Sequence, residues 1–444
     1  MMAPGVLRRA TRLVALFVAL TSALPVWAGV QPSRKWELPN GVRVVFQENE
    51  RTATVVMCGF VRVTALHEVR PGPGIRSLTN MCVGRAEGCE EIIRRAALRV
   101  DTAVAPDYVE IIVSAPAESV NECAEVLRRL LFSPQLSEAG LETERALLLR
   151  RFAARGEVPT GVAMDLALDR TYPGSGGVAR VSGDPLVVSQ LTLDEVRRFH
   201  AAHYLPNATV ISVSGGVRTE ATRNLIAGVM GGLLPGGVPA QAPMSPSQVQ
   251  EGRASVRWAG ESGVVCVGAR AVSLDSPDYP AAAVAMVLLS SGGGSRLFQA
   301  LRVDRALAYT ITGDITPSSV APVMTVLVAA DRAEVGEVER VVAAEIDRLV
   351  AQPPDLDELR RAKRYLIGQH ALRHQRNEEI AHFLGVFEML GGAPGYRLDT
   401  LLAGRFAAVG AAEVQRVASE IFERRTVVVL GDEADTPAER DANH

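Results

Sequence analysis

The chain has 444 residues, of which 48% are hydrophobic and 22% charged, and its 47 basic and 50 acidic side chains give a formal net charge of −3. This composition excludes a disordered chain, and it shows no basic excess of the kind that binds nucleic acid or an anionic membrane surface. A chain of 444 residues is also too long for one ordinary hydrophobic core, so we expect at least two domains.

The first 28 residues have the pattern of a secretory signal peptide. Arg8, Arg9 and Arg12 form a basic region, residues 13–24 are apolar, and residues 26–28 place small side chains at the two positions that signal peptidase reads. An uncleaved anchor is the alternative, but the apolar run is short for a membrane span of about 20 residues. We therefore predict cleavage after Ala28 and export to a bacterial periplasm.

Five cysteines are too few and odd in number for a fold built on disulfides, although export would permit such bonds. Cys58 and Cys266 lie in apolar strand-like runs, where cysteine acts as a small buried hydrophobe. Cys82 and Cys89 have a spacing that would let them pair across a helix end, and the sequence leaves this open. No Cys-x-x-Cys motif occurs, which argues against a cysteine-based zinc site.

The first half alternates strands with helices. Pro39-Asn40-Gly41 predicts a hairpin turn, and the β-branched run 53–64 predicts a core strand. Apolar periodicity predicts further strands over 107–115 and 209–214, and helices over 75–83, 90–98, 119–131, 140–154, 160–168 and 193–200.

The second half repeats this plan. Residues 413–431 resemble residues 195–215, because both segments read as a helix, a short turn, a strand and a glycine. Since a repeat near 200 residues indicates a duplicated domain, we predict an α+β fold of two homologous domains, each a mixed sheet with helices packed on one face. The predicted boundaries are a first domain over 29–232, a Gly/Pro/Ser-rich linker over 233–250, a second domain over 251–435 and a tail over 436–444.

The segment 295–309 places two reactive side chains at element ends. Residues 295–303 predict a helix and residues 308–312 a strand, so Arg302 lies near the helix end and Tyr309 near the strand start. A guanidinium and a phenol that converge can stabilise an oxyanion on a peptide carbonyl, whereas a surface arginine and a half-buried tyrosine are the simpler interpretation. Gly292, Gly293 and Gly294 precede this helix without the Lys-Ser/Thr of a phosphate-binding loop.

Three segments, LPNGVRVVFQEN (38–49), FHAAHYLPNATVISVSG (199–215) and GGGSRLFQALRVDRALAYTI (292–311), resemble the pitrilysin-type metallopeptidases. These inverzincins include mitochondrial processing peptidase, and the resemblance covers nearly everything after the signal segment. The family binds zinc through His-x-x-Glu-His and a downstream glutamate. Here Ser77 and Met81 stand at the histidine positions, Asn80 at the general base and Arg151 at the downstream glutamate. A hydroxyl, a thioether, an amide and a cation neither hold zinc nor activate water, so we expect no metal and no peptidase activity in the isolated chain.

The resemblance also implies a role that does not need the metal. In the family an arginine and a tyrosine seven positions apart contact the substrate, and Arg302 and Tyr309 match that spacing. In two-chain members one subunit holds the zinc and the other donates this pair. The resemblance therefore implies a heterodimer with a zinc-bearing sister subunit and a peptide substrate, which the loop 292–294 would also contact. A non-enzymatic scaffold, like the core subunits of respiratory complexes, is the alternative.

Two other groups of histidines have spacings that deserve comparison with metal sites. His370 and His374 lie at i and i+4, with Glu378 and His382 further along what reads as the same helix face, although we favour a solvated polar face over a ligand set. For the pair His200 and His203, near the end of the first domain, we expect packing and hydrogen bonding.

Overall fold

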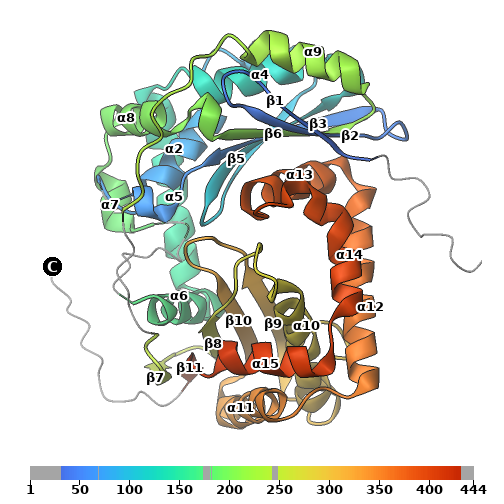
Figure 1. Cartoon of the computed structure of the whole chain (residues 1–444). Coiled ribbons are helices and arrows are strands. Elements are labelled where there is room, and N and C mark those ends of the chain that lie inside the picture. Colours follow the sequence, from blue (N-terminus) through green and yellow to red (C-terminus); the bar gives the residue numbers. More distant parts are fainter. Residues whose placement is uncertain (1–31, 69, 174–180, 182, 243–248, 432–444) are drawn as a thin grey trace, which may run out of the picture. The chain divides into compact units, whose positions relative to one another are not determined.

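The computed structural model describes residues 32–431 except 69, 174–180, 182 and 243–248, so the predicted signal peptide and tail lie outside the described residues. Two β-sheets carry the fold (Figure 1). The first has the strand order β1-β2-β6-β3-β5-β4 and the second the order β7-β11-β8-β10-β9. The strands of the first sheet are β1 (Arg34–Glu37), β2 (Arg43–Glu48), β3 (Thr54–Arg62), β4 (Arg99–Val104), β5 (Tyr108–Pro116) and β6 (Thr209–Gly215). Those of the second are β7 (Gly252–Arg257), β8 (Ser262–Arg270), β9 (Ala308–Thr316), β10 (Val323–Asp331) and β11 (Arg425–Gly431).

The two sheets share one pairing plan. β2 runs parallel to β6, and β7 runs parallel to β11, while all other pairings in both sheets are antiparallel. Without β1, the first sheet has the same strand order as the second. The repeated segments become α8 (Leu193–His203) with β6 and α15 (Ala411–Phe422) with β11. The predicted mixed α+β fold with two sheets is confirmed.

One face of each sheet carries helices from its own half. On the first sheet the apolar core lies under α2 (Ile75–Gly84), α4 (Val120–Phe132), α8 and α9 (Thr219–Met230). On the second sheet it lies under α10 (Tyr279–Ser290), α11 (Val335–Ala351) and α15. Of these helices, α4, α8, α9, α11 and α15 each bury one side, as their sequence periodicity predicts, whereas α2 and α10 are buried almost all round.

The other face of each sheet is covered by a helix from the other half (Figure 1). α13 (Asn377–Leu390) packs on β2, β3 and β6, and α6 (Pro159–Thr171) packs on β8, β10 and β11. Gly385 permits the first of these contacts, because a Cβ there would lie 2.0 Å from the ring of Phe60. Each sheet is therefore buried on both faces, whereas the sequence analysis predicted helices on one face only.

Several local predictions were wrong. The edge strands β4 and β7 were not predicted, because RVDTAV and GRASVR lack a hydrophobic run. α12 (Leu356–Leu372) ends before a 3₁₀ turn, η6 (Arg373–Gln375), so His370 and His382 do not share one helix. Cys82 and Cys89 are both free and buried, as are the other three cysteines, so the possible disulfide does not form. The remaining helices are α3 (Glu90–Arg95), α5 (Glu138–Gly156), α7 (Pro185–Gln190) and α14 (Leu398–Ala408).

Candidate functional site

A cavity of about 330 Å³ brings Ser77, Met81 and Arg151 together. α2 supplies Ser77 and Met81, α5 supplies Arg151, and the edge strand β4 forms a further wall through residues 102–104. Three of the four positions predicted to mark a lost zinc site therefore line one cavity beside a sheet edge. The fourth, Asn80, does not line it.

The polar groups at these positions are engaged in holding the fold. The Ser77 hydroxyl donates to the carbonyl of Val181 at 2.7 Å. The Asn80 amide donates to the carbonyls of Ala103 at 2.8 Å and Glu110 at 3.2 Å, and its oxygen accepts from Tyr204 at 3.2 Å. Asn80 thus fastens α2 to β4 and β5.

Glu144 is a site residue whose role the sequence did not reveal. It is the single acidic side chain lining this cavity within the described part of the chain, it is buried, and it pairs with Arg85. The guanidinium of Arg151 lies 4.0 Å from the Met81 sulfur. Zinc sites need several nitrogen, thiolate or carboxylate donors, and one carboxylate that already pairs with an arginine does not suffice. The residues at this cavity do not fit a zinc ion.

Arg302 and Tyr309 lie on the second half, and both are exposed. Arg302 belongs to a π-helical turn, η4 (Phe298–Val303), and its guanidinium carbon lies 5.5 Å from the centre of the Phe298 ring. Tyr309 is the extra residue of a bulge in the edge strand β9, is 47% exposed and donates to the carbonyl of Ala330 at 3.3 Å. Bulges re-aim side chains at sheet edges, and π-turns are frequent at functional sites. Neither residue lines the cavity that Ser77, Met81 and Arg151 share.

The glycine segment 292–294 connects α10 to η4 and is exposed. Gly292 has a φ of +77°, a conformation that favours glycine, and a Cβ there would lie 3.1 Å from Tyr365. Gln299 donates to the carbonyl of Gly293 at 2.5 Å, which ties this turn to the following helix.

His370 and His374 come together with Asp399, with ligand atoms within 4.8 Å of one another. His374 donates from Nδ1 to the carbonyl of His370 at 3.0 Å and from Nε2 to the Asp399 carboxylate at 2.8 Å. Burial alone would lower the pKa of His374. The hydrogen bond to Asp399 and the negative charge of Asp399 outweigh burial and raise the pKa. Both ring nitrogens of His374 thus lie against oxygen acceptors, and a metal ion would have to displace these contacts.

The expectation of a solvated polar face here was wrong. His370 is 2% exposed, and the cluster joins α12 and η6 to α14 through buried hydrogen bonds. His382 belongs to α13 and pairs with Glu110 of the first sheet at 2.9 Å, away from this cluster.

His200 and His203 serve packing, as predicted. His200 donates to the carbonyl of Leu131 at 3.0 Å and stacks on Tyr204, while His203 packs against the rings of His67 and Phe199. Burial lowers the pKa of each to about 4, so both rings are neutral near neutral pH.

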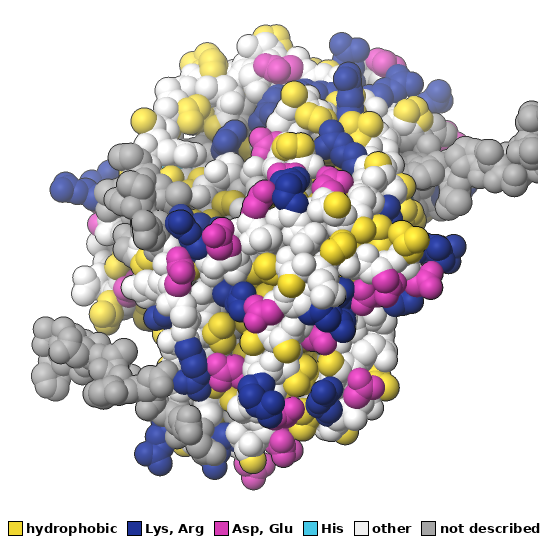
Figure 2. Space-filling model, turned by 60° about the horizontal axis from the view of Figure 1, so that its bottom comes forward, with side chains coloured by type: hydrophobic (Ala, Val, Ile, Leu, Met, Phe, Trp, Pro, Cys, Tyr) yellow, Lys and Arg dark blue, Asp and Glu magenta, His cyan; other side chains and the backbone are white. Residues whose placement is uncertain are grey.

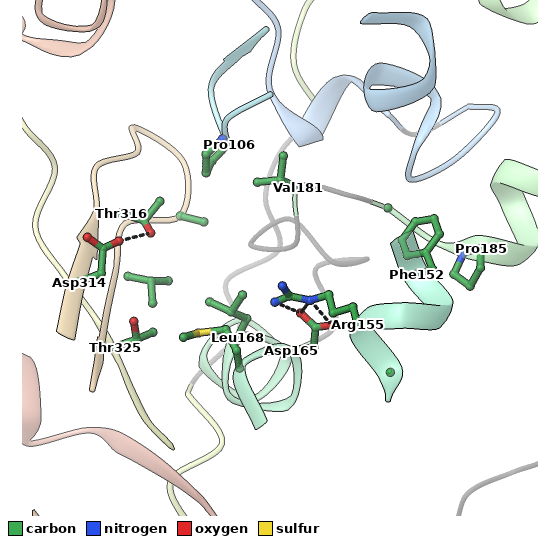
Figure 3. A pocket seen from close by; sticks show the side chains of 15 residues that line it. Pro106, Phe152, Arg155, Asp165, Leu168, Val181, Pro185, Asp314, Thr316 and Thr325 are labelled. Carbon is green, nitrogen blue, oxygen red and sulfur yellow. Dashed lines mark hydrogen bonds and ion pairs between the residues drawn. The ribbon is translucent and has the colours of Figure 1, made fainter. Parts of the chain in front are cut away.

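A larger cavity of about 480 Å³ lies between the α5–α6 corner and the strands β9 and β10. Figure 3 shows Arg155 and Asp165 pointing toward each other on one side, with Asp314, Thr316 and Thr325 across from them. Arg155 donates three hydrogen bonds to Asp165, of 3.0, 2.9 and 2.7 Å. The charges on that wall therefore neutralise each other.

Figure 2 shows side chains of both charge signs on one face of the molecule. On the face drawn in Figure 2, basic and acidic side chains are interspersed and do not form a patch of one sign. None of the described helices combines the length and apolar character needed to cross a bilayer.

Comparisons with known proteins agree with this geometry. The model of a family described as "Peptidase M16 inactive domain" matches residues 190–366 of this chain. An uncharacterized zinc protease of Streptomyces coelicolor is 25% identical over 443 residues, covering 93% of this chain and 92% of that protein. The non-peptidase homolog YmxG of Helicobacter pylori is 22% identical over 296 residues, covering 65% of this chain and 67% of that protein.

A solved structure extends the likeness to the whole fold. The crystal structure of a peptidase M16 inactive domain from Pseudomonas fluorescens superposes with a TM-score of 0.80 at 19% identity, covering 91% of this chain and all of that one. At this level of identity the superposition establishes the fold, and function has to be argued from the site.

Proposed function

From the premise that this chain is an inactive member of the M16, or pitrilysin-type, peptidase family, we propose that it is the metal-free subunit of a two-chain zinc peptidase. It would pair with a zinc-bearing sister subunit and supply Arg302 and Tyr309 to the substrate bound there. The zinc would belong to the sister alone.

The observation that carries this proposal is the contrast between two sites. The cavity beside β4 has a serine, a methionine and an arginine where the family has metal ligands, and its one acid is paired. The Arg302 and Tyr309 side chains, by contrast, are both exposed on a turn and an edge strand. In this proposal, a chain without a water-activating metal would still offer two exposed side chains to stabilise an oxyanion at the partner's zinc.

The edges of the sheets fit an extended peptide. β4 is the last strand of the first sheet and β9 the last of the second, so each leaves main-chain groups for an added strand. β4 also forms one wall of the cavity that Ser77, Met81 and Arg151 line, so a peptide bound along β4 would pass Arg151. Main-chain hydrogen bonds would then dominate recognition and give a loose sequence preference.

The role of Tyr309 requires one local change. Its hydroxyl would leave the carbonyl of Ala330, a single hydrogen bond of 3.3 Å, and donate to the substrate carbonyl. Arg302 is held only by its contact with Phe298 among the described residues, so its guanidinium is available to a substrate oxygen. Loss of one such donor costs about 3 kcal/mol, or roughly 10²–10³ in rate.

The test is co-expression with a sister chain that carries His-x-x-Glu-His, followed by a peptide-cleavage assay. The isolated chain should cleave nothing, with or without added zinc. In the complex, Arg302→Ala and Tyr309→Phe should lower kcat by roughly 10²–10³ while the complex still assembles. Arg340→Ala, an exposed arginine on α11, is the matched control and should leave kcat unchanged.

Equal turnover of wild type and both variants would exclude this mechanism. Purification of the chain in a complex that has no peptidase would favour the scaffold alternative.

We also propose that the mature chain is exported to the periplasm. Sequencing the N-terminus of the secreted protein tests this, and a start at residue 29 is the expected result.

A further inference from the structure

A cavity of about 390 Å³ lies where the end of β9 meets α12, α13 and α14, and it shares no lining residue with the cavity of Ser77, Met81 and Arg151. Its walls come from both halves of the chain and are mainly aromatic and aliphatic. The rings are those of Tyr108, Tyr279, Phe383, Phe387 and Phe406. Cavities of this size with apolar walls and a few polar groups are typical of small-molecule sites.

Arg373 lines this cavity and forms no ion pair with any residue that the structure describes. Arg373 is half-buried, and its guanidinium carbon lies 4.0 Å from the centre of the Phe383 ring. It forms no hydrogen bond or ion pair with any residue that the structure describes; the nearby Asp399 is engaged by His374 at 2.8 Å. Burial lowers the pKa of Arg373, yet a guanidinium stays charged at neutral pH. Its fork of N–H donors is therefore unused.

Two hydroxyl groups at the same cavity are also unused. Tyr108 and Tyr279 both line it, and neither hydroxyl forms a hydrogen bond within the described residues. The other polar rings there are committed, since His382 pairs with Glu110 at 2.9 Å and His370 donates to the carbonyl of Asp399 at 2.6 Å. Among the described residues these three side chains have no hydrogen-bond partner, although all of them line one cavity with mainly apolar walls. They therefore present a guanidinium and two phenols as donors to an acceptor on a bound ligand.

We propose that this cavity binds a small organic carboxylate that carries an aromatic or branched apolar group. The carboxylate would accept from Arg373 and Tyr279, and the apolar group would lie among the phenylalanine rings. A planar guanidinium matches a carboxylate with two parallel hydrogen bonds. The proposal concerns this chain alone and does not depend on a sister subunit.

Two sources share this chemistry: a free amino acid and the C-terminal residue of a peptide. Asp314 of β9 also lines the cavity, and its carboxylate would attract the ammonium group of a free amino acid. A peptide end has an amide at that position and gains nothing from Asp314. The two sources are therefore separable by the charge on the ligand nitrogen.

The experiment is calorimetric titration of the full mature chain with N-acetyl-phenylalanine and with its neutral counterpart, N-acetyl-phenylalaninamide. The acid should bind and the amide should bind at least roughly tenfold more weakly. Arg373→Gln should weaken binding of the acid by roughly tenfold to hundredfold, and Tyr279→Phe by roughly twofold to tenfold. Arg376→Gln, three residues away in an exposed pair with Glu378, should bind as wild type does. Phenylalanine itself, titrated in parallel, binds tighter than the acetylated form if the source is a free amino acid and more weakly if it is a peptide end.

Equal affinity for acid and amide, no binding of either, or unchanged affinity in Arg373→Gln would each overturn the proposal. If Arg373→Gln does not fold, as a thermal melt would reveal, the comparison of acid with amide on wild type and the Tyr279→Phe variant decide the matter.

Discussion

The helices α2 and α10 hold equivalent places in the two halves. α2 follows β3, the antiparallel neighbour of β6, and α10 follows β8, the antiparallel neighbour of β11. They bury different chemistry. α10 buries every residue from Pro280 to Ser290, and only Ser290 has a polar side chain. α2 buries Arg76, Ser77, Thr79 and Asn80 among its apolar residues. The first half thus buries polar side chains on this helix, beside the positions predicted to mark a lost zinc site, while the second half uses the same position for apolar core packing.

Arg76 anchors that polar frame. Its side chain is fully buried, lies 3.7 Å from the Glu68 carboxylate and donates to the carbonyls of Val63 at 3.2 Å and Pro106 at 3.1 Å. Glu68 in turn accepts from the backbone of Gly74 and Arg76, at 3.1 and 3.0 Å. This network positions the start of α2, and with it the cavity that Ser77 and Met81 line.

The largest effect should come from breaking the frame. Arg76→Met should lower the free energy of unfolding by about 3–5 kcal/mol, because it leaves the Glu68 carboxylate buried without its counter-charge. Urea denaturation measures this. Adding Glu68→Gln should recover part of the loss, and a loss below about 1 kcal/mol in Arg76→Met would show that the pair is not a structural unit.

The matching change in the second half should act through packing alone. Leu289→Ala should cost about 2–5 kcal/mol, since Leu289 is fully buried and its removal leaves a cavity. Leu356→Ala, at a 74% exposed position, is the control and should change stability by less than about 0.5 kcal/mol. The two variants should then differ in whether a second substitution restores stability. Glu68→Gln should restore part of the stability lost in Arg76→Met, whereas no polar substitution should restore the packing lost in Leu289→Ala.

The first half should also be the more sensitive to acid. The pKa of His200 lies at about 4 in the folded chain, below its ordinary 6.5, so its stabilising effect is complete above pH 6.5 and is lost as pH falls toward 4. One pKa unit corresponds to about 1.4 kcal/mol, so the loss from His200 is on the order of 3 kcal/mol. Unfolding measured across this range should show the decline, and His200→Gln should flatten it. An unchanged slope in that variant would assign the acid sensitivity to other groups.

The smallest effect should have the opposite sign and lie in the second half. The pKa of His374 is raised in the folded chain, so its pairing with Asp399 stabilises fully below pH 6.5 and is lost as pH rises through the folded pKa. A modest decrease in stability on the alkaline side should therefore vanish in His374→Gln. Tight binding of zinc or nickel by the wild-type cluster, seen in a metal titration, would contradict its description as an ion pair.

The sequence predicts most of the fold because its core strands are β-branched runs and its helices have regular apolar stripes. The segments 195–215 and 413–431 also predict the duplication. What it could not predict depends on distant partners. α6 and α13 have ordinary amphipathic patterns, and nothing local indicates that each covers a sheet of the other half. β4 was missed because an edge strand carries polar side chains, yet it forms a wall of the altered cavity.

Site residues were predictable where a motif carried them and not where the fold assembles them. Ser77, Met81 and Arg151 come from recognisable positions in two helices and line one cavity. Asn80 was also identified, but its side chain serves the α2–sheet contact. The aromatic cavity with Arg373 collects residues from segments between Ala105 and Phe406, so no spacing in the sequence points to it.

The exchange of α6 and α13 has a consequence for any attempt to divide this protein. A fragment ending in the 233–250 segment would retain its own sheet but lack the helix that seals one side of it, and the complementary fragment would have the same defect. Each piece would expose a broad apolar surface that only the other piece fits. The two fragments should therefore fold only when they associate with each other. Cleavage of the chain between the halves should be tolerated far better than the removal of either half.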